Sequence, residues 1–256
     1  MDVVKPFLYW IGLILFLLLE TGFSYRQSSV SKLKRWLTNV PLSLFNGIAY
    51  YLLYSSIFAA LLLKVDQQDI GLLNRFDFPY WMDVSAGIIV LDFFVYIWHL
   101  LNHKMPLLWK FHRVHHCDMN MDVSTAGRFH IGEFLISGLV RLTVIYTFGI
   151  SITTYIIFEI LMNAAIQFHH SSIKISRGFE RYWWLLFVPP SMHRIHHSIR
   201  LEESDSNYGA LFSLWDRFIG TMKADIDQNG IVIGTTPKRE FDKLGFGHML
   251  LMPFTK

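Results

Sequence analysis

The apolar positions of this chain gather in five long stretches that are separated by short polar segments. These stretches cover residues 6–19, 42–63, 79–101, 131–149 and 151–168. A helix needs about 20 apolar residues to cross the hydrocarbon core of a bilayer, and the second and third stretches satisfy this requirement well. The first stretch is shorter, and we interpret it as a membrane anchor. Only a short turn around Gly149 separates the last two, so they form a tight helical hairpin that crosses twice or re-enters.

The composition supports an integral membrane protein. Hydrophobic residues make up 52% of the 256 residues, charged residues make up 17%, and the mean hydropathy is positive. This is too apolar for an ordinary soluble domain of that length. No repeat or flexible linker separates a second domain. We therefore predict one all-α membrane domain over residues 1–256, a helical bundle of about four spans in which residues 222–256 form a C-terminal tail.

The charges between the apolar stretches orient the bundle, because short cytoplasmic loops carry an excess of lysine and arginine. The loop after the first stretch holds Arg26, Lys32, Lys34 and Arg35. The loop after the second carries Lys64 and Arg75 against four aspartates, Asp66, Asp69, Asp77 and Asp83. We therefore place the first loop in the cytoplasm and the second outside. The net charge of +3 is mild and no basic stripe exists, which argues against a nucleic-acid partner.

Histidines carry the most specific chemical signal of the chain. Eleven of the twelve lie between residues 99 and 197, and most of them recur at helical spacing. The clusters are His99 and His103; His112, His115 and His116; His169 and His170; and His193, His196 and His197. Neutral imidazole is the commonest metal ligand among side chains, and so many rings predict a centre with more than one metal ion. The charge pattern brings every cluster to the cytoplasmic side of the membrane, as a single site requires.

Helical geometry separates the better ligand candidates from their neighbours. At about 100° per residue, Glu159, Asn163 and His170 share one face of their helix, and His169 points away from it. We therefore prefer His170 as a ligand and keep His169 as a further candidate. Asp92 shares a stripe with His99 and His103, so it is a candidate hydrogen-bond partner for a metal-bound ring.

The motifs His99-Leu-Leu-Asn-His103, His112-Arg-Val-His115-His116 and His193-Arg-Ile-His196-His197 together resemble the signature of the fatty acid hydroxylase and sterol desaturase superfamily. The resemblance covers about residues 80–221, including Asn207-Tyr208-Gly209 and the segment from Trp215 to Thr221. It is greatest for the sterol desaturase and alkylglycerol monooxygenase branches. The resemblance implies a membrane-embedded di-iron oxygenase that hydroxylates or desaturates an unactivated C–H bond of a sterol, fatty acyl or alkylglycerol lipid.

The resemblance also implies the cofactors and partners. These are two iron ions held by the clustered histidines, O₂, a membrane lipid as substrate, and two electrons from outside the chain. Zinc is an expected substitute for iron, because it competes well for imidazole ligands. The sequence contains no haem, flavin or iron–sulfur motif and only one cysteine, so the electrons come from a separate donor. A cytochrome b5-like protein, a ferredoxin and a pterin-linked donor all remain open. We predict no catalytic residue beyond the metal ligands.

Six further residues are candidates for supporting the site or binding substrate, and most of them also have a structural interpretation. They are Asp92, Glu159, Asn163, His130, Tyr208 and Asp216. The acids either orient a metal-bound histidine or serve packing, with Arg141 as an ion-pair partner for Asp92 or Glu159 and Arg217 as a partner for Asp216. His130 binds substrate, orders a loop or caps a helix. Tyr208 lines the site or anchors the chain at the membrane interface.

Three other functions fit parts of the sequence. The first is a carotenoid hydroxylase, the second is a zinc-dependent membrane lipid hydrolase, and the third is a membrane protein that binds metal without catalysis. A hydrolase needs a carboxylate that bridges the metals or acts as a base beside them. None of Asp92, Glu159 and Asp216 lies within a histidine cluster, and this favours the oxygenase.

Overall fold

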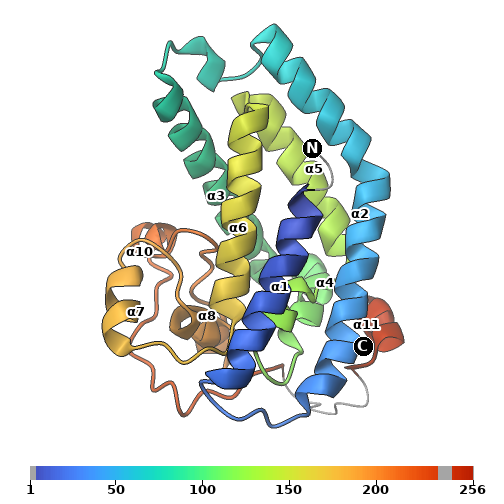
Figure 1. The fold of residues 1–256 in the computed structure, drawn as a ribbon, viewed down its shortest axis with the longest axis vertical. Helices are drawn as coiled ribbons and strands as arrows, with labels where there is room; N and C mark the ends of the chain where they lie inside the picture. The colour runs from blue at the N-terminus through green and yellow to red at the C-terminus, as the bar shows by residue number, and fades with distance from the viewer. Residues whose placement is uncertain (1–3, 236–243, 256) are drawn as a thin grey trace.

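Five long helices run side by side and carry a cap of short helices near one end (Figure 1). The computed structural model describes residues 4–235 and 244–255. The long helices are α1 (Val4–Gly22), α2 (Lys32–Gln68), α3 (Tyr80–Lys104), α5 (Ile131–Phe148) and α6 (Ile152–His170). The short ones are η1 (Leu73–Arg75), α4 (Pro106–His116), η2 (Val123–Gly127), α7 (Arg177–Trp183), α8 (Pro190–His196), α9 (Leu201–Ser204), α10 (Leu214–Ile219), α11 (Phe246–Leu251) and η4 (Met252–Phe254).

The predicted all-α class is confirmed. Within the described residues the chain forms no strand, only three isolated β-bridges. Three helices are long and apolar enough to cross a membrane, namely α2 with the segment that follows it, α3 and α5. Helix α1 is apolar over a shorter length, from Phe7 to Gly22. The helices therefore match the apolar stretches of the sequence closely.

Residues with special backbone preferences set the helix boundaries. Pro79 precedes α3, and Pro106 opens α4 directly after α3 has ended at Lys104. Proline suits the first turn of a helix because the missing N–H has no partner there in any case. Between α5 and α6, Gly149 ends one helix in the left-handed conformation and Ser151 caps the next through the amide of Thr154. This produces the predicted tight hairpin.

Two glycines allow the two helix connections at the end of the bundle opposite the cap to pack against each other. Gly149 has φ +74° and Gly71 has φ +121°, and each backbone passes so close to the other loop that an added Cβ would collide with it. The amide of Leu72 also donates to the carbonyl of Thr147 over 3.0 Å. Since only glycine adopts these conformations without strain and leaves this space, the turn between α5 and α6 packs directly on the connection between α2 and α3.

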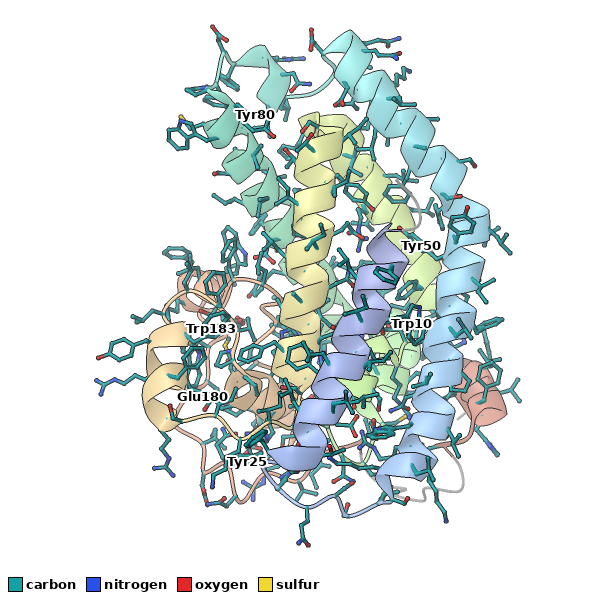
Figure 2. All side chains as sticks on the ribbon, in the orientation of Figure 1. Trp10, Tyr25, Tyr50, Tyr80, Glu180 and Trp183 are labelled. Atoms are coloured by element: carbon teal, nitrogen blue, oxygen red, sulfur yellow. The ribbon has the colours of Figure 1, made fainter. Side chains whose placement is uncertain are left out.

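Apolar side chains cover both the inside and the outside of the long helices (Figure 2). The core between the helices includes the buried rings of Tyr54, Phe58, Tyr155 and Phe158. Many outward-facing side chains are also large and apolar, for example Leu52, which is 71% exposed. Many large exposed apolar side chains on the long helices mark a membrane-facing region, since soluble proteins rarely expose large apolar patches.

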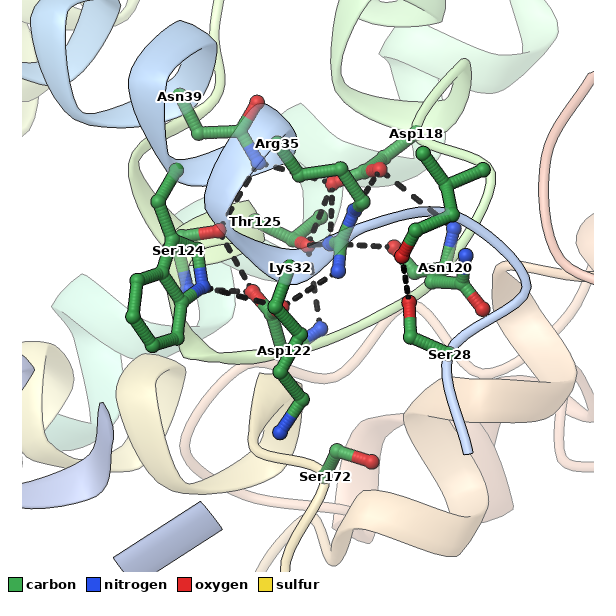
Figure 3. A network of polar contacts seen from close by, with 12 residues as sticks. Ser28, Lys32, Arg35, Asn39, Asp118, Asn120, Asp122, Ser124, Thr125 and Ser172 are labelled. Carbon is green, nitrogen blue, oxygen red and sulfur yellow. Dashed lines mark hydrogen bonds and ion pairs between the residues drawn. The ribbon is translucent and has the colours of Figure 1, made fainter. Parts of the chain in front are cut away.

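A buried ionic network joins the start of α2 to the loop between α4 and η2 (Figure 3). The guanidinium of Arg35 donates to both carboxylate oxygens of Asp118, over 2.6 and 2.7 Å, and to Asp122 over 2.5 Å. Burial alone would raise the pKa of the Asp118 carboxyl, but the charge and hydrogen bonds of Arg35 outweigh it and hold this pKa below its usual range. Of the four basic residues assigned to the loop after the first apolar stretch, Lys32, Lys34 and Arg35 lie in the first turn of α2 instead, and Arg35 is buried there.

Candidate metal centre

The four helices that carry the histidine motifs end at one place, close to the cap. Helix α3 brings His99 and His103 to it in its last two turns, and α6 ends there at His170. The short helices α4 and α8 carry the two HxxHH motifs and are buried along nearly all of their histidine-bearing residues. Residues nearly 100 positions apart in the chain thereby come into contact.

Nine histidines form two adjacent groups. The first group consists of His99, His103, His112, His116 and His196, and the second consists of His115, His170, His193 and His197. Within each group, one ring nitrogen of every member lies within 4.8 Å of the corresponding nitrogens of all the others. Each HxxHH motif supplies both groups. Its two outer histidines, four residues apart, join one group, while the middle histidine joins the other.

Hydrogen bonds on the outer side of the rings fix which nitrogen is free to bind a metal. Nδ1 of His170 lies 2.8 Å from the carbonyl oxygen of Ile166, and Nδ1 of His115 lies 3.2 Å from that of Arg128. A carbonyl oxygen can only accept, so both Nδ1 atoms carry the proton and both Nε2 atoms carry a lone pair. These two Nε2 atoms face each other at 3.1 Å. Two lone pairs at this distance repel each other unless a cation lies between them.

The first group follows the same rule. Nδ1 of His99 donates to the carbonyl of Tyr208 over 2.8 Å, and Nδ1 of His196 donates to that of Ser206 over 2.7 Å. The Nε2 atoms of His99, His112 and His196 are buried and lack a hydrogen-bond partner. Burying such a group unpaired costs free energy. The arrangement is therefore explained by a ligand that accepts several lone pairs at once.

The spacing of the rings fits metal ions. Nitrogens bound to one ion over about 2.1 Å lie about 3.0 Å apart when they are at right angles. In the second group, His193 Nε2 lies 2.9 Å from that of His170 and 3.1 Å from that of His197. Among the residues that the structure describes, neither group includes a carboxylate or a thiolate. The donor set of both groups is therefore imidazole alone.

Burial keeps the rings of the cap neutral. It lowers the pKa of His115, His116, His193 and His197 well below the usual value, and that of His196 to about 3, and neighbouring rings add to the effect in every case. Only a deprotonated ring nitrogen can bind a metal ion. The rings of α4 and α8 are therefore ready to act as ligands at neutral pH.

Two supports of the ligand rings were not predicted. Glu133, in the first turn of α5, accepts a hydrogen bond from His112 Nδ1 over 2.9 Å. The carbonyl of Arg128 accepts one from His115, and the guanidinium of Arg128 is in turn held by Val114 and Asn39. The sequence feature that could have identified Glu133 is its position, as an acid three residues into the helix that follows the first HxxHH motif.

His169 and His130 lie outside both groups. The ring of His169 packs 4.1 Å, between centroids, from the ring of His193, and His169 lines the cavity described below. His130 caps α5 by accepting a hydrogen bond from the amide of Gly132, and its Nε2 contacts the carbonyl of Leu250 over 3.1 Å. Of the three roles considered for His130, the geometry matches the helix cap.

Asp92 and Asp216 hold the segment after α9 against α3 rather than orienting a ring directly. Asp92 accepts hydrogen bonds from the amides of Leu211 and Phe212 and from the indole of Trp215. Asp216 accepts from the amides of Tyr208 and Gly209 over 2.8 Å each. Because the carbonyl of Tyr208 accepts from His99, Asp216 positions that ring through the backbone.

The remaining candidates divide between packing and the metal centre. Arg141 donates to Glu159 over 2.7 Å, and the amide of Asn163 donates to the carbonyl of Glu159. The ion pair joins α5 to α6, the amide bond lies within α6, and both match the packing interpretation. Tyr208 lies against the first group, with its ring centroid 5.2 Å from that of His103, and its hydroxyl donates to Asp205.

A largely apolar cavity adjoins both histidine groups. It has an empty volume of about 440 Å³ and is lined by six histidines together with Trp98 of α3, Ile166 of α6 and Phe129, which lies just before α5. A second cavity of about 340 Å³ lies deeper between α3, α5 and α6, and Trp98 lines both. The two cavities therefore meet on either side of the Trp98 ring, between the helices and the ring nitrogens.

Comparison of the sequence with known protein families agrees with this architecture. The model of the fatty acid hydroxylase family matches residues 84–221, which is more than half of the chain and includes every histidine of both groups. The chain belongs to the fatty acid hydroxylase family. No solved structure matches it significantly.

Several curated relatives of this family member are lipid-modifying enzymes by name. An ornithine lipid hydroxylase of Rhizobium tropici is 28% identical over 70% of this chain and 52% of its own length. The human alkylglycerol monooxygenase is 27% identical over 68% of this chain and 38% of its own length. A cholesterol 25-hydroxylase-like protein of Danio rerio is 26% identical over 55% of each chain. The family member thus spans about half or less of the relatives it matches.

Removing the carboxylate that supports His112 is expected to weaken metal binding without unfolding this family member. Glu133→Gln keeps the shape of the side chain but loses the charge that accepts the proton of His112 Nδ1. Loss of such a partner typically lowers metal affinity by about 10–100-fold. Equilibrium competition with a chelator measures this directly, and Glu202→Gln, on an exposed acid, is the control. Equal affinities of the two variants would show that Glu133 does not support the metal.

Proposed function

We propose that this chain is an O₂-dependent hydroxylase that uses two iron ions to oxidise an unactivated C–H bond of a membrane lipid. The single observation that carries the proposal is the pair of all-imidazole groups at the end of an apolar cavity within a membrane helix bundle. The names of the relatives, which are hydroxylases and monooxygenases, favour hydroxylation over desaturation.

The proposed reaction consumes one O₂, two electrons and two protons. One oxygen atom enters the C–H bond to give an alcohol, and the other leaves as water. Bound iron would supply the activation of O₂, since iron sites of oxygenases keep positions open for it. The first and second histidine groups would hold one ion each. The electrons come from a separate donor.

The protein's own side chains would position the lipid. Trp98 lies at the junction of the two cavities, and Phe129 and Ile166 line the one beside the histidines. These apolar walls bind a hydrocarbon chain and exclude water, so the chain moves from the bilayer to the site without crossing an aqueous phase. The length of the path between Arg141 and the histidines then selects which carbon is reached.

The zinc hydrolase alternative receives less support from the site. A hydrolase needs a free carboxylate beside the metal-bound water. Glu133 is the acid in contact with a ring of either group at hydrogen-bond distance, and its Oε1 is already engaged with the outer nitrogen of His112. Glu133 also lines the cavity, but it belongs to neither histidine group and its carboxylate supports a ligand ring, so the oxygenase is the better interpretation.

We also infer that the metal centre faces the cytoplasm. Lys32 and Lys34 begin α2 at the end of the bundle that carries the histidines, while Asp66, Asp69 and Asp77 lie at the other end. An excess of lysine and arginine marks the cytoplasmic end of membrane helices. An electron donor would then meet the site from that side.

Isotope labelling tests the proposed reaction. The iron-loaded protein, supplied with a chemical reductant and a membrane lipid extract under ¹⁸O₂, is expected to form lipid alcohols that carry one ¹⁸O atom. Mass spectrometry of the lipids detects the gain, and protein under argon is the control. Lipid cleavage under argon by the zinc-loaded protein would instead establish a hydrolase.

A further inference from the structure

A large groove on the cap, separate from the cavity beside the histidines, is rich in unpaired positive charge. It lies between α7, the start of α8 and residues 222–229, and has an empty volume of about 1920 Å³ that includes its open mouth. Tyr25, which follows α1, and Glu180 of α7 lie on two of its sides (Figure 2). Five basic side chains line it, namely Lys174, Arg177, Arg181, Arg194 and Arg217.

The most telling of these is Arg194, which lies at the floor of the groove. Its side chain is only 4% exposed, its guanidinium stacks 4.0 Å above the ring of Tyr25, and Nη1 donates to the amide oxygen of Gln228. Among the described residues, no carboxylate lies within 4.0 Å of it. A buried charge without a counter-ion is costly, so its presence at the floor of an open groove points to an anionic ligand.

Across the ranges that the structure describes, the other four basic residues also carry positive charge without a counter-ion, and most of them lie at the rim of the groove. Lys174, Arg177 and Arg181 are exposed, and Arg217 is held by the carbonyls of Trp184 and Leu185. Within the described part of the chain, none of the four forms an ion pair, although Glu180, Asp225 and Asp227 also line the groove. Five positive charges against three negative ones leave the groove with an excess of two.

The surroundings of the groove indicate a membrane surface. The neighbouring helices α7 and α10 lie on the flank of the bundle rather than beyond its end (Figure 1). These helices and the turn after α7 expose large side chains that suit the membrane interface, with Tyr182 76%, Leu185 61% and Phe218 77% exposed. Such side chains next to arginine and lysine are typical of a surface that lies at the depth of lipid headgroups.

The shape of the groove distinguishes a lipid headgroup from a protein partner. Arg194 is nearly inaccessible and lies beneath the rim, so a carboxylate on the convex surface of a folded protein would not reach it. A phosphate on a flexible headgroup would. Arginine also binds phosphate through two parallel hydrogen bonds, which increases both affinity and selectivity.

We propose that this groove binds the phosphate of an anionic phospholipid and thereby docks the cap on the membrane. The site is distinct from the cavity that leads to the histidines, and it needs neither metal nor turnover. Its occupancy would hold α7 and α8 at a fixed depth in the headgroup layer. Basic pockets of this kind on the cytoplasmic side of membrane proteins bind anionic headgroups.

Lipid binding to the full-length purified protein in neutral detergent tests the proposal. The probes are short-chain phosphatidylglycerol, short-chain phosphatidylcholine and inorganic phosphate, and native mass spectrometry and the thermal unfolding temperature report binding. We expect saturable binding of phosphatidylglycerol in preference to the other two. Arg177→Gln/Arg181→Gln should weaken it by about 25-fold, since each basic residue near a membrane surface contributes about a factor of five.

Two further variants make the outcome decisive. Arg194→Gln should abolish the preference for phosphatidylglycerol, and if this variant fails to fold, the exposed pair of Arg177 and Arg181 still tests the site. Lys64→Gln/Arg75→Gln removes two exposed charges from the opposite end of the bundle and should bind like the unmodified protein. Equal binding of the two phospholipids, or unchanged binding after loss of Arg177 and Arg181, would overturn the proposal. Phosphate binding as strong as lipid binding would reassign the groove to a free anion.

Discussion

Replacing His116 or His196 by alanine is expected to abolish lipid turnover. Both rings belong to the first group, and each lies within 4.8 Å of the other ligand nitrogens of that group. Removing one ring leaves the lone pairs of His99 and His112 without a properly coordinated cation. Since loss of a hydrogen-bond partner of a ligand already costs about 10–100-fold in metal affinity or activity, we expect loss of the ligand itself to exceed about 100-fold.

The metal content of these variants distinguishes a local effect from unfolding. Each is expected to lose the ion of the first group and to keep the helix content of the unmodified protein in circular dichroism. His248→Ala is the matched control, because His248 is an exposed histidine of α11 that belongs to neither group. Full turnover after loss of His116 or His196 would exclude the first group from catalysis.

Replacing Arg35 by methionine is expected to cause the largest loss of stability. Arg35 is 1% exposed, and its guanidinium is the cation that neutralises both Asp118 and Asp122. Removing one partner of a buried ionic cluster typically costs about 3–5 kcal/mol, because the remaining charges stay buried without compensation. At about 2–4 °C per kcal/mol for a domain of this size, the unfolding temperature should fall by roughly 10 °C.

Thermal unfolding in one detergent measures this effect, and Lys34→Met, on the exposed neighbouring residue, serves as the control. The double variant Arg35→Met/Asp118→Asn should be more stable than Arg35→Met alone, because it removes one uncompensated charge. If Arg35→Met unfolded at the same temperature as Lys34→Met, the network would be unimportant for folding. The network also holds the loop from which Arg128 orients His115.

The sequence predicted the elements that depend on local patterns. The apolar stretches became α1, α2, α3, α5 and α6, because hydrophobic length and periodicity act within one segment. The HxxHH spacing also places its histidines close together, since residues three and four apart share a helix face. The preference for His170 over His169 follows from the same periodicity, and the structure places only His170 in a group.

Contacts between distant segments could not be predicted in this way. The pairing of Arg35 with Asp118 joins residues 83 positions apart, and the support of His112 by Glu133 depends on how α5 packs on α4. Asp92 was a candidate partner for a ring because it shares a stripe of α3 with His99. In the structure the backbone of Leu211 and Phe212 occupies its carboxylate, and no pattern within α3 indicates this.

The central claim is that nine histidines form two metal sites beside a lipid cavity, and metal stoichiometry tests it most directly. Elemental analysis of the purified, iron-reconstituted protein should give two ions per chain. His196→Ala, in the first group, and His197→Ala, in the second, should each retain one. One ion or none in the unmodified protein, or the loss of no ion in either variant, would contradict the account.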